Sequence, residues 1–281
     1  MIEPPIIQNE IYQSGIFVPR NSWQQKRIAS GQVMKLEDSR YDQQKDVFIS
    51  RVDNALIEKF FELYISHVNL GNASKEREVL NSAVLPLLKD DIIRFLNGKG
   101  FFPAPPINYA IQTNKAHRIL LEKETVNEKR KRNRSNLSEM SSTAKRGGHG
   151  FAGLHVDNWS TPRRSAKERN RAGVRFGLNL GVEFREVAFL DFPVHEMFER
   201  LRSVLGDAAK TLMEMDFATP AADAFLYHFP DYRVQKITLP PGFCYVLPVQ
   251  NLIHDGFPFR KQKTDINLMV SADHWKTSCA L

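Results

Sequence analysis

GLHVDNW (residues 153–159) is the first of a series of short β-type runs that fills the C-terminal half of the chain. Turn residues separate the later runs, which are GVRFGLNLGV, REVAFLDF, DAFLYHF, YRVQKITL, FCYVLPVQ and DINLMVSA. One segment among them, PVHEMFERLRSVLGDAAKTL, is amphipathic and is predicted to be a helix. Many short strands with turn signals between them are typical of an antiparallel sandwich or barrel.

The N-terminal half has a different pattern. Apolar residues recur at spacings of three and four from Asp53 to Gly98, which predicts two amphipathic helices, the second beginning near Asn72 or Ser74. The proline-rich FFPAPP (101–106) ends this pattern, and an extended segment is expected after it. Helices followed by strands predict an α+β fold with the helices packed on one face of the barrel.

The net charge of +7 is concentrated in one segment. Residues 123–146 carry eight Lys and Arg against three Glu, and no aromatic residues alternate with these charges, so nucleic-acid binding is not favoured. We expect a flexible connector there, or a lid over an anionic substrate. Two cysteines, Cys244 and Cys279, are too few for a disulfide framework, and no apolar run is long enough for a membrane span. A soluble, cytoplasmic protein is expected.

Within GLHVDNW, His155 and Asp157 are two residues apart and would project from the same face of a strand. An isolated His-x-Asp pair is a weak signal, but a third ligand is available in His254, at the end of the predicted strand YVLPVQNLIH. His228 and His274 are alternative third ligands. Two imidazoles and one carboxylate leave three positions of an octahedral ion open, which fits iron better than a closed structural zinc site.

Residues 150–275 resemble the double-stranded β-helix (jelly-roll) core of the iron(II)/2-oxoglutarate-dependent oxygenases, whose barrel is cupin-like. The residues that carry this resemblance are the His-x-Asp pair, the distal histidine, and the segments NLGVEFREVAFL and PPGFCYVLPVQNLIHDG. The resemblance implies that His155, Asp157 and His254 bind Fe(II), with 2-oxoglutarate and O₂ as cosubstrates. It also implies a division into helical support (1–122), a basic loop or lid (123–149) and a catalytic core (150–281).

In this family a cation holds the far carboxylate of 2-oxoglutarate. Many members place it about ten residues after the distal histidine, but Thr264 stands there in this chain, with Arg260 nearby. Other members take the cation from the middle of the core, where Arg185 is similar in placement and is preferred. Asn179 is expected either to add a hydrogen bond to the cosubstrate or to form a turn. Arg175 is a third possible anchor, or a solvent-facing residue.

Because Asp157 is retained, the resemblance implies hydroxylation, desaturation, ring formation or demethylation rather than halogenation. We expect a small natural-product or amino-acid-like substrate. Residues 161–175 hold six Arg and Lys against one Glu and include Arg164, so an anionic substrate is expected if they overhang the site; otherwise they form a solvated loop. Trp159 either lines the substrate pocket or packs in the core.

The rival functions are a non-catalytic cupin-like binding protein and an oxygenase that acts on protein or nucleic acid. The sequence does not predict the oligomeric state.

Overall fold

The computed structural model describes residues 47–68, 75–114, 154–158, 168–169, 173–214, 218–229, 232–257, 261 and 263–277, together with the backbone of short strands between residues 6 and 34. Its strands are β1 (Ile6–Gln13), β2 (Ile16–Phe17), β3 (Lys26–Arg27), β4 (Val33–Met34), β5 (Val47–Arg51), β6 (Phe101–Asn114), β7 (Arg175–Asn179), β8 (Arg185–Phe189), β9 (Arg233–Leu239), β10 (Phe243–Leu247), β11 (His254–Phe257) and β12 (Asp265–Thr277).

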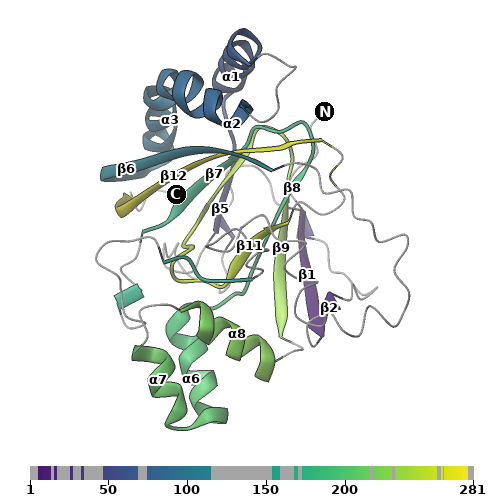
Figure 1. The fold of residues 1–281 in the computed structure, drawn as a ribbon, viewed down its shortest axis with the longest axis vertical. Coiled ribbons are helices and arrows are strands. Elements are labelled where there is room, and N and C mark those ends of the chain that lie inside the picture. Colours follow the sequence, from purple (N-terminus) through teal and green to yellow (C-terminus); the bar gives the residue numbers. More distant parts are fainter. Residues whose placement is uncertain are drawn as a thin grey trace.

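The helices form two groups at opposite ends of the molecule (Figure 1). The N-terminal group consists of α1 (Asn54–His67), α2 (Glu76–Val79), a π-helical turn (Leu80–Val84) and α3 (Leu85–Gly98). The second group consists of α6 (Val194–Leu205), α7 (Ala208–Glu214) and α8 (Thr219–His228). Among the described residues, no helix has both the length and the apolar composition needed to cross a bilayer.

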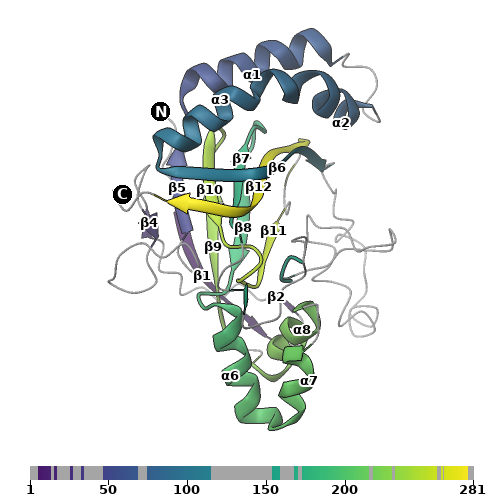
Figure 2. The ribbon, with the colours of Figure 1, turned by 90° about the vertical axis from the view of Figure 1, so that its left-hand side faces the viewer.

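The strands form two antiparallel sheets between these helical groups (Figure 2). The first sheet has the order β4-β5-β10-β7-β12-β6. The second has the order β11-β8-β9-β1-β2, with β3 paired to β1, and His155 adds an isolated bridge to its β11 edge. From β6 onward the chain passes back and forth between the sheets, which is the winding of a jelly roll. The predicted double-stranded β-helix with supporting helices is therefore confirmed.

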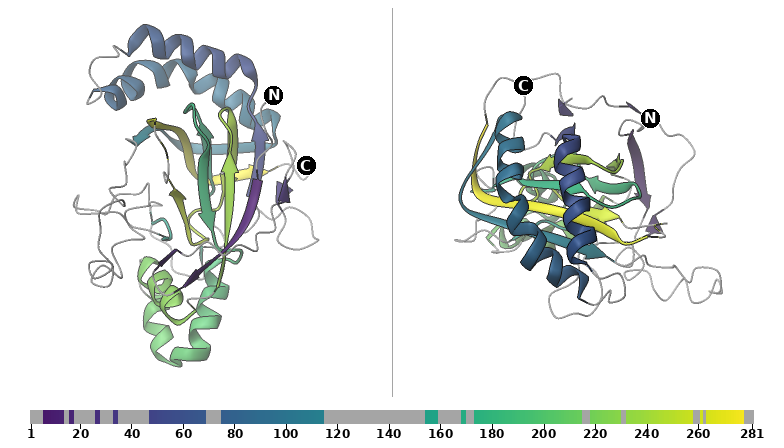
Figure 3. Two further views of the ribbon diagram at one scale, coloured as in Figure 1. Left: turned by 90° about the vertical axis from the view of Figure 1, so that its right-hand side faces the viewer. Right: turned by 90° about the horizontal axis from the view of Figure 1, so that it is seen from above.

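Side-chain alternation divides each strand between two environments. On β7, Phe176 and Leu178 face the hydrophobic core beneath α1 and α3, which cross the outer side of the first sheet (Figure 3). The next residues along the strand, Arg175, Gly177 and Asn179, therefore face the space between the two sheets. Apolar side chains of β8, β9 and β10 fill much of that space. A third core cluster joins α6 and α8 to the outer side of the second sheet.

The structure corrects two local expectations and extends a third. DAFLYHF was expected to be a strand, but it lies in α8, where Ala221, Ala222 and Phe225 are buried. FFPAPP follows the end of the helical pattern, as expected, and the extended segment expected after it already includes it, because β6 begins at Phe101 at the edge of the first sheet. His254 was expected at the end of a strand, but it begins β11.

Candidate metal centre

His155 and His254 lie directly opposite each other in a short antiparallel bridge. The amide of each residue donates a hydrogen bond to the carbonyl of the other, at 3.0 Å from His155 and 2.8 Å from His254. Opposed residues in such a pair project to the same face. The two imidazole rings accordingly lie with their centroids 4.8 Å apart. The backbone alone thus brings together two histidines that are 99 positions apart in the sequence.

Asp157 completes the cluster. Its amide donates to the carbonyl of Val249 at 3.0 Å, so the strand that carries His155 continues alongside the segment that leads to His254. The Asp157 Oδ1 atom lies 3.4 Å from His155 Nε2, and Oδ2 lies 3.7 Å from His254 Nε2. One ligand atom from each residue lies within 4.8 Å of the others. The structure thus brings together the three residues that the sequence analysis selected.

The surroundings of His254 prepare its Nε2 atom for a metal ion. Nδ1 lies 3.1 Å from the carbonyl of Leu252. Because a carbonyl only accepts hydrogen bonds, Nδ1 carries the proton and Nε2 presents its lone pair to the cluster. Burial lowers the pKa of His254 to about 3, although the charge of Asp157 acts in the opposite direction. The imidazole is therefore neutral at neutral pH and need not lose a proton to bind a cation.

Asp157 is also held in its ligating form. Burial raises the pKa of the Asp157 carboxyl, but the charge of Arg175 and contacts with His155 and His254 outweigh burial, so the pKa lies well below its ordinary value. Arg175 Nη2 lies 2.5 Å from Asp157 Oδ2. The solvent-facing alternative for Arg175 is therefore wrong, since this side chain is engaged with Asp157 between the sheets.

The alternative third ligands do not reach the cluster. His228 is exposed at the end of α8, and His274 is exposed on β12. Among the described residues, the cluster of possible metal ligands consists of His155, Asp157 and His254. Two imidazoles and a carboxylate form a ligand set that fits a divalent transition metal of intermediate softness.

A second charged cluster lies at the other end of β8. Arg185 faces the space between the sheets, and its guanidinium bonds one carboxylate oxygen of Asp265. The ammonium of Lys261 bonds the other oxygen. All three side chains are buried, and the hydroxyl of Tyr245 also contacts Arg185. Two cations thus share one carboxylate, which leaves one formal positive charge in the interior.

Unpartnered polar atoms lie beside this charge. Among the described residues, the Arg185 Nε atom and both polar atoms of the Asn267 side chain are buried without a hydrogen-bond partner. Asn267 lies directly opposite Asn179 in the β7–β12 pair. Buried polar groups normally have partners, so these atoms could bind a polar ligand or water between the sheets. The carboxylate of a small dicarboxylic acid has the charge and the acceptors that these groups lack.

Asn179 uses its amide differently. Its Nδ2 atom donates to the carbonyls of Glu183 and Leu239, at 2.9 and 3.0 Å, and its Oδ1 atom accepts the amide of Gly181 at 3.0 Å. These bonds fix the turn between β7 and β8, as the turn interpretation of Asn179 expects.

Four residues of this charged cluster were not selected from the sequence, namely Lys261, Asp265, Tyr245 and Asn267. The available signal was the pair Asp265 and Asn267 at the start of the final strand, two polar residues on the inward face where the resemblance implies a cation. Trp159, Arg164, Arg260 and the basic segment 123–149 lie outside the described residues.

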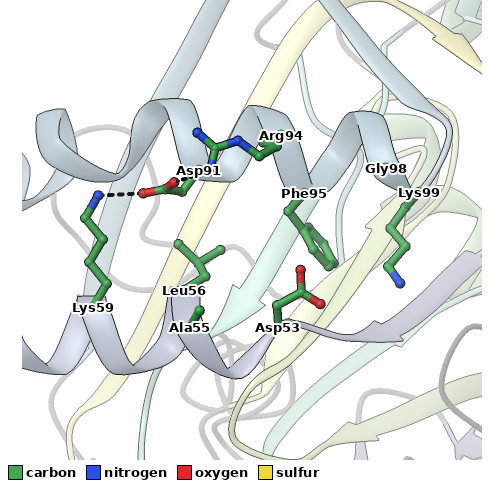
Figure 4. Close-up of a pocket in the computed structure, with 9 residues that line it drawn as sticks. All are labelled: Asp53, Ala55, Leu56, Lys59, Asp91, Arg94, Phe95, Gly98 and Lys99. Atoms are coloured by element: carbon green, nitrogen blue, oxygen red, sulfur yellow. Dashed lines mark hydrogen bonds and ion pairs between the residues drawn. The ribbon is translucent and has the colours of Figure 1, made fainter.

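A pocket of about 390 Å³ lies elsewhere, between α1 and α3 (Figure 4). Lys59 bonds Asp91 across it at 2.6 Å, and Asp91 also bonds Arg94 at 3.0 Å. None of the three clustered ligand residues lines this pocket. It belongs to the helical layer outside the first sheet.

Comparisons with known proteins give weak matches. No protein-family model matches the sequence, and no curated protein matches it significantly. The Kdo hydroxylase KdoO, a non-heme Fe(II) alpha-ketoglutarate-dependent dioxygenase solved with succinate and Fe(III), is 12% identical, with a TM-score of 0.42 over 84% of this chain and 80% of that chain. An N-substituted L-amino acid dioxygenase from Burkholderia ambifaria, solved with alpha-ketoglutarate, is 11% identical, with a TM-score of 0.34 over 98% and 99% of the two chains.

Proposed function

We propose that this protein is an Fe(II)/2-oxoglutarate-dependent oxygenase. The observation that carries the proposal is the convergence of His155, Asp157 and His254 inside a double-stranded β-helix. Two imidazoles and one carboxylate occupy one face of an octahedral ion and leave three positions for cosubstrate and O₂. Iron bound there would supply the oxidation of an unactivated C–H bond by O₂, coupled to the oxidative decarboxylation of 2-oxoglutarate to succinate.

The protein groups have three tasks in this proposal. His155, Asp157 and His254 hold the metal. The hydrogen bond from His254 to Leu252 keeps the imidazole in the tautomer that binds. The surrounding barrel excludes water from the reacting carbon. Each of the two histidines is about 5% exposed, which is consistent with a shielded site.

Arg185 is the proposed anchor for the far carboxylate of 2-oxoglutarate. It starts β8, whereas Phe189 at the end of β8 pairs with His254. Four strand residues span about 13 Å, so a long guanidinium side chain and a five-carbon diacid can together bridge the interval. Lys261 supplies the second charge and Asn267 an amide without a partner among the described residues. Asp265 holds both cations in place.

Arg175 and Asn179 have other partners in the structure. Arg175 is already paired with Asp157, and the Asn179 amide is committed to backbone groups. Arg260 is retained as an alternative anchor. Support for Arg185 comes from its burial, its inward direction and its unpartnered Nε atom.

We propose a small, anionic substrate of the natural-product or amino-acid type, in line with the basic composition of residues 161–175. Trp159 and Arg164 are proposed to contact it, and the segment 123–149 to cover it. A cupin-like binding protein without turnover, and an oxygenase acting on protein or nucleic acid, are the alternatives. Deleting residues 126–146 tests the last of these alternatives. If the segment covers a small substrate, the deletion should alter turnover of that substrate. If the segment binds a protein or nucleic acid, turnover of a small substrate should be unchanged.

The deciding experiment measures succinate and CO₂ formation from 2-oxoglutarate with Fe(II) and O₂, with and without candidate substrates. We expect formation by the wild type and its loss in His155→Ala and Asp157→Ala. Arg94→Gln, a change of an exposed residue on α3, is the matched control and should keep the activity. A wild type that binds divalent metal through His155 yet never consumes 2-oxoglutarate would favour the non-catalytic alternative.

A further inference from the structure

Arg169 is a buried cation within the basic segment 161–175. Only 3% of the residue is exposed. Burial lowers its pKa to about 10, with the charge of Asp157 acting in the opposite direction, so the guanidinium remains charged at neutral pH. Burying a cation is costly unless its N–H groups are bonded. The acceptors of the hydrogen bonds that the guanidinium donates therefore show which segments Arg169 connects.

The Arg169 guanidinium bonds the two segments that carry the metal ligands. Its Nη1 atom donates to the carbonyl of Asp157 at 3.0 Å and to the carbonyl of Gln250 at 2.9 Å. Its Nη2 atom donates to the side-chain oxygen of Asn158. Asp157 is itself a ligand, and Gln250 lies four residues before His254. One planar fork of donors thus joins two segments that are about 90 positions apart.

Backbone bonds also join these segments: the amide of Asp157 donates to the carbonyl of Val249, and His155 and His254 exchange two bonds. The guanidinium adds side-chain bonds to this backbone pairing, on the side of Asp157 and Gln250. Without the guanidinium, the Gln250 carbonyl and the Asn158 side-chain oxygen would each lose a charge-assisted bond, and the Asp157 segment would lose its side-chain tie to Gln250.

We propose that Arg169 is a positioning residue that fixes the Asp157 and His254 segments relative to each other, so that the metal ligands converge before the ion binds. Such preorganisation raises affinity because the ion need not order the loops. The inference rests on the metal site of the proposed function, but it does not depend on turnover. It assigns a specific task to a residue that touches neither the ion nor the ligating atoms.

The test is Co(II) affinity, measured anaerobically by calorimetry on the full chain below the melting transition. Charge and positioning predict opposite results for Arg169→Gln. Removing a nearby positive charge should tighten the binding of a cation, whereas loss of positioning should weaken it. We expect a loss of about 10- to 100-fold, the range seen when groups supporting a metal ligand are removed. Arg169→Lys, which keeps the charge but loses the fork, should fall between Arg169→Gln and the wild type.

The visible absorption spectrum of bound Co(II) provides a second readout, because its intensity reports ligand number and geometry. We expect an altered spectrum in Arg169→Gln and an unaltered one in the control Arg94→Gln. A purely structural role would lower the melting temperature and leave both Co(II) affinity and spectrum of the folded protein unchanged. That result, or equal or tighter Co(II) binding by Arg169→Gln, would overturn the inference.

If Arg169→Gln does not fold, Asn158→Ala decides, because it removes one of the three acceptors and leaves the guanidinium in place. We expect a several-fold loss of Co(II) affinity, and unchanged affinity would refute the positioning role. A wild type that binds no Co(II) would instead refute the proposed function itself. A wild type that binds Co(II), loses it in His155→Ala and is indifferent to Arg169 and Asn158 would refute this inference alone.

Discussion

Gly177 lies directly opposite Tyr245 in the β7–β10 pair, and the tyrosine ring covers the place where a side chain at position 177 would begin. A Cβ atom there would lie 2.3 Å from the ring carbon Cζ. The ring is buried between the sheets, and its hydroxyl contacts Arg185, so it has little room to move. We expect Gly177→Ala to lower the free energy of unfolding by about 1–3 kcal/mol, the usual cost of overpacking. Urea denaturation measures this.

Gly98→Ala is the matched control for that substitution. Nothing lies within 4 Å of a Cβ atom at position 98, which ends α3. Alanine is also the better helix former, so stability should be unchanged or slightly higher. A Gly177→Ala protein as stable as the wild type would show that the Tyr245 ring moves aside without cost.

Arg185 gives a prediction about the cosubstrate. Replacing a charge-assisted hydrogen bond costs about 1.5–3 kcal/mol, which corresponds to roughly a 10- to 100-fold change in affinity. We expect Arg185→Lys to raise the KM for 2-oxoglutarate toward this range, with a smaller effect on Co(II) affinity. The measurement is 2-oxoglutarate-dependent succinate formation. An unchanged KM for 2-oxoglutarate would transfer the anchoring role to Arg260 or Arg175.

At the scale of single residues, sequence reasoning reached the ligands but not the ion cluster. His155 and Asp157 were accessible because strand alternation relates neighbours in the chain. The contact between Arg185 and Asp265 joins residues 80 positions apart and depends on how two sheets face each other. The local sequence pattern does not show which residues of the two sheets lie close together in space, so Asp265 and Lys261 were not recognised.

At the scale of elements, Asp265 links β8 to β12 across the space between the sheets. Burial raises the pKa of its carboxyl, but the charges of Arg185 and Lys261 outweigh burial and hold the pKa below its ordinary value of 3.8. The unfolded chain therefore binds a proton at higher pH than the folded protein does. Stability from this group is fully present above about pH 5, and it is lost as the pH falls below about 4 toward the folded-state pKa.

We expect Asp265→Asn to lose about 3–5 kcal/mol of stability at pH 7, because two buried cations are left without a counter-charge. Its stability should also depend less on pH between about 5 and 2 than that of the wild type. Urea denaturation at several pH values measures both effects. Asp91→Asn, which removes a carboxylate from the pocket between α1 and α3, controls for general loss of acidic charge. Parallel pH profiles of wild type and Asp265→Asn would contradict the assignment.

The misjudged elements have physical causes. DAFLYHF is apolar and aromatic enough for a strand, but Ala221, Ala222 and Phe225 place their side chains on one side of a helix that packs beside α6. FFPAPP is tolerated in β6 because this strand is at the edge of its sheet, where a missing N–H removes no ladder bond on the open side. The N-terminal strands β1 to β5 were not predicted, and two of them, β1 and β5, join their sheets by pairing with β9 and β10, far along the chain.

At the scale of the whole molecule, the barrel is clamped between two helical groups, and each sheet therefore has an apolar outer side as well as an apolar inner one. Helices had been expected on one face of the barrel only. The order of the strands was reached through resemblance rather than through pattern, because hydrophobic periodicity identifies strands and not their neighbours. Arg185, Lys261 and Asp265 form a buried charged cluster beside these apolar inner surfaces, and there the local pattern and the fold disagree, as expected for a functional site.

Cys244 reports on the opening of this whole assembly. It lies on β10, between β5 and β7 in the first sheet, and is fully buried. Burial raises the pKa of its thiol to about 12, although backbone contact with Ser50 and the charge of Lys99 act in the opposite direction. At pH 8 only about one thiol in 10⁴ is ionised, and alkylating reagents cannot reach it without the sheet opening.

We expect Cys244 to resist iodoacetamide at pH 8 in a Cys279→Ser protein and to react fully in guanidinium chloride. Because β10 is central, opening should require global unfolding, so the labelling rate should rise with denaturant along the slope of equilibrium unfolding. A rate that is independent of denaturant would show that local motion exposes the sheet. Saturating Co(II) should slow the labelling further if the ion binds only the folded barrel, and His155→Ala should abolish that slowing.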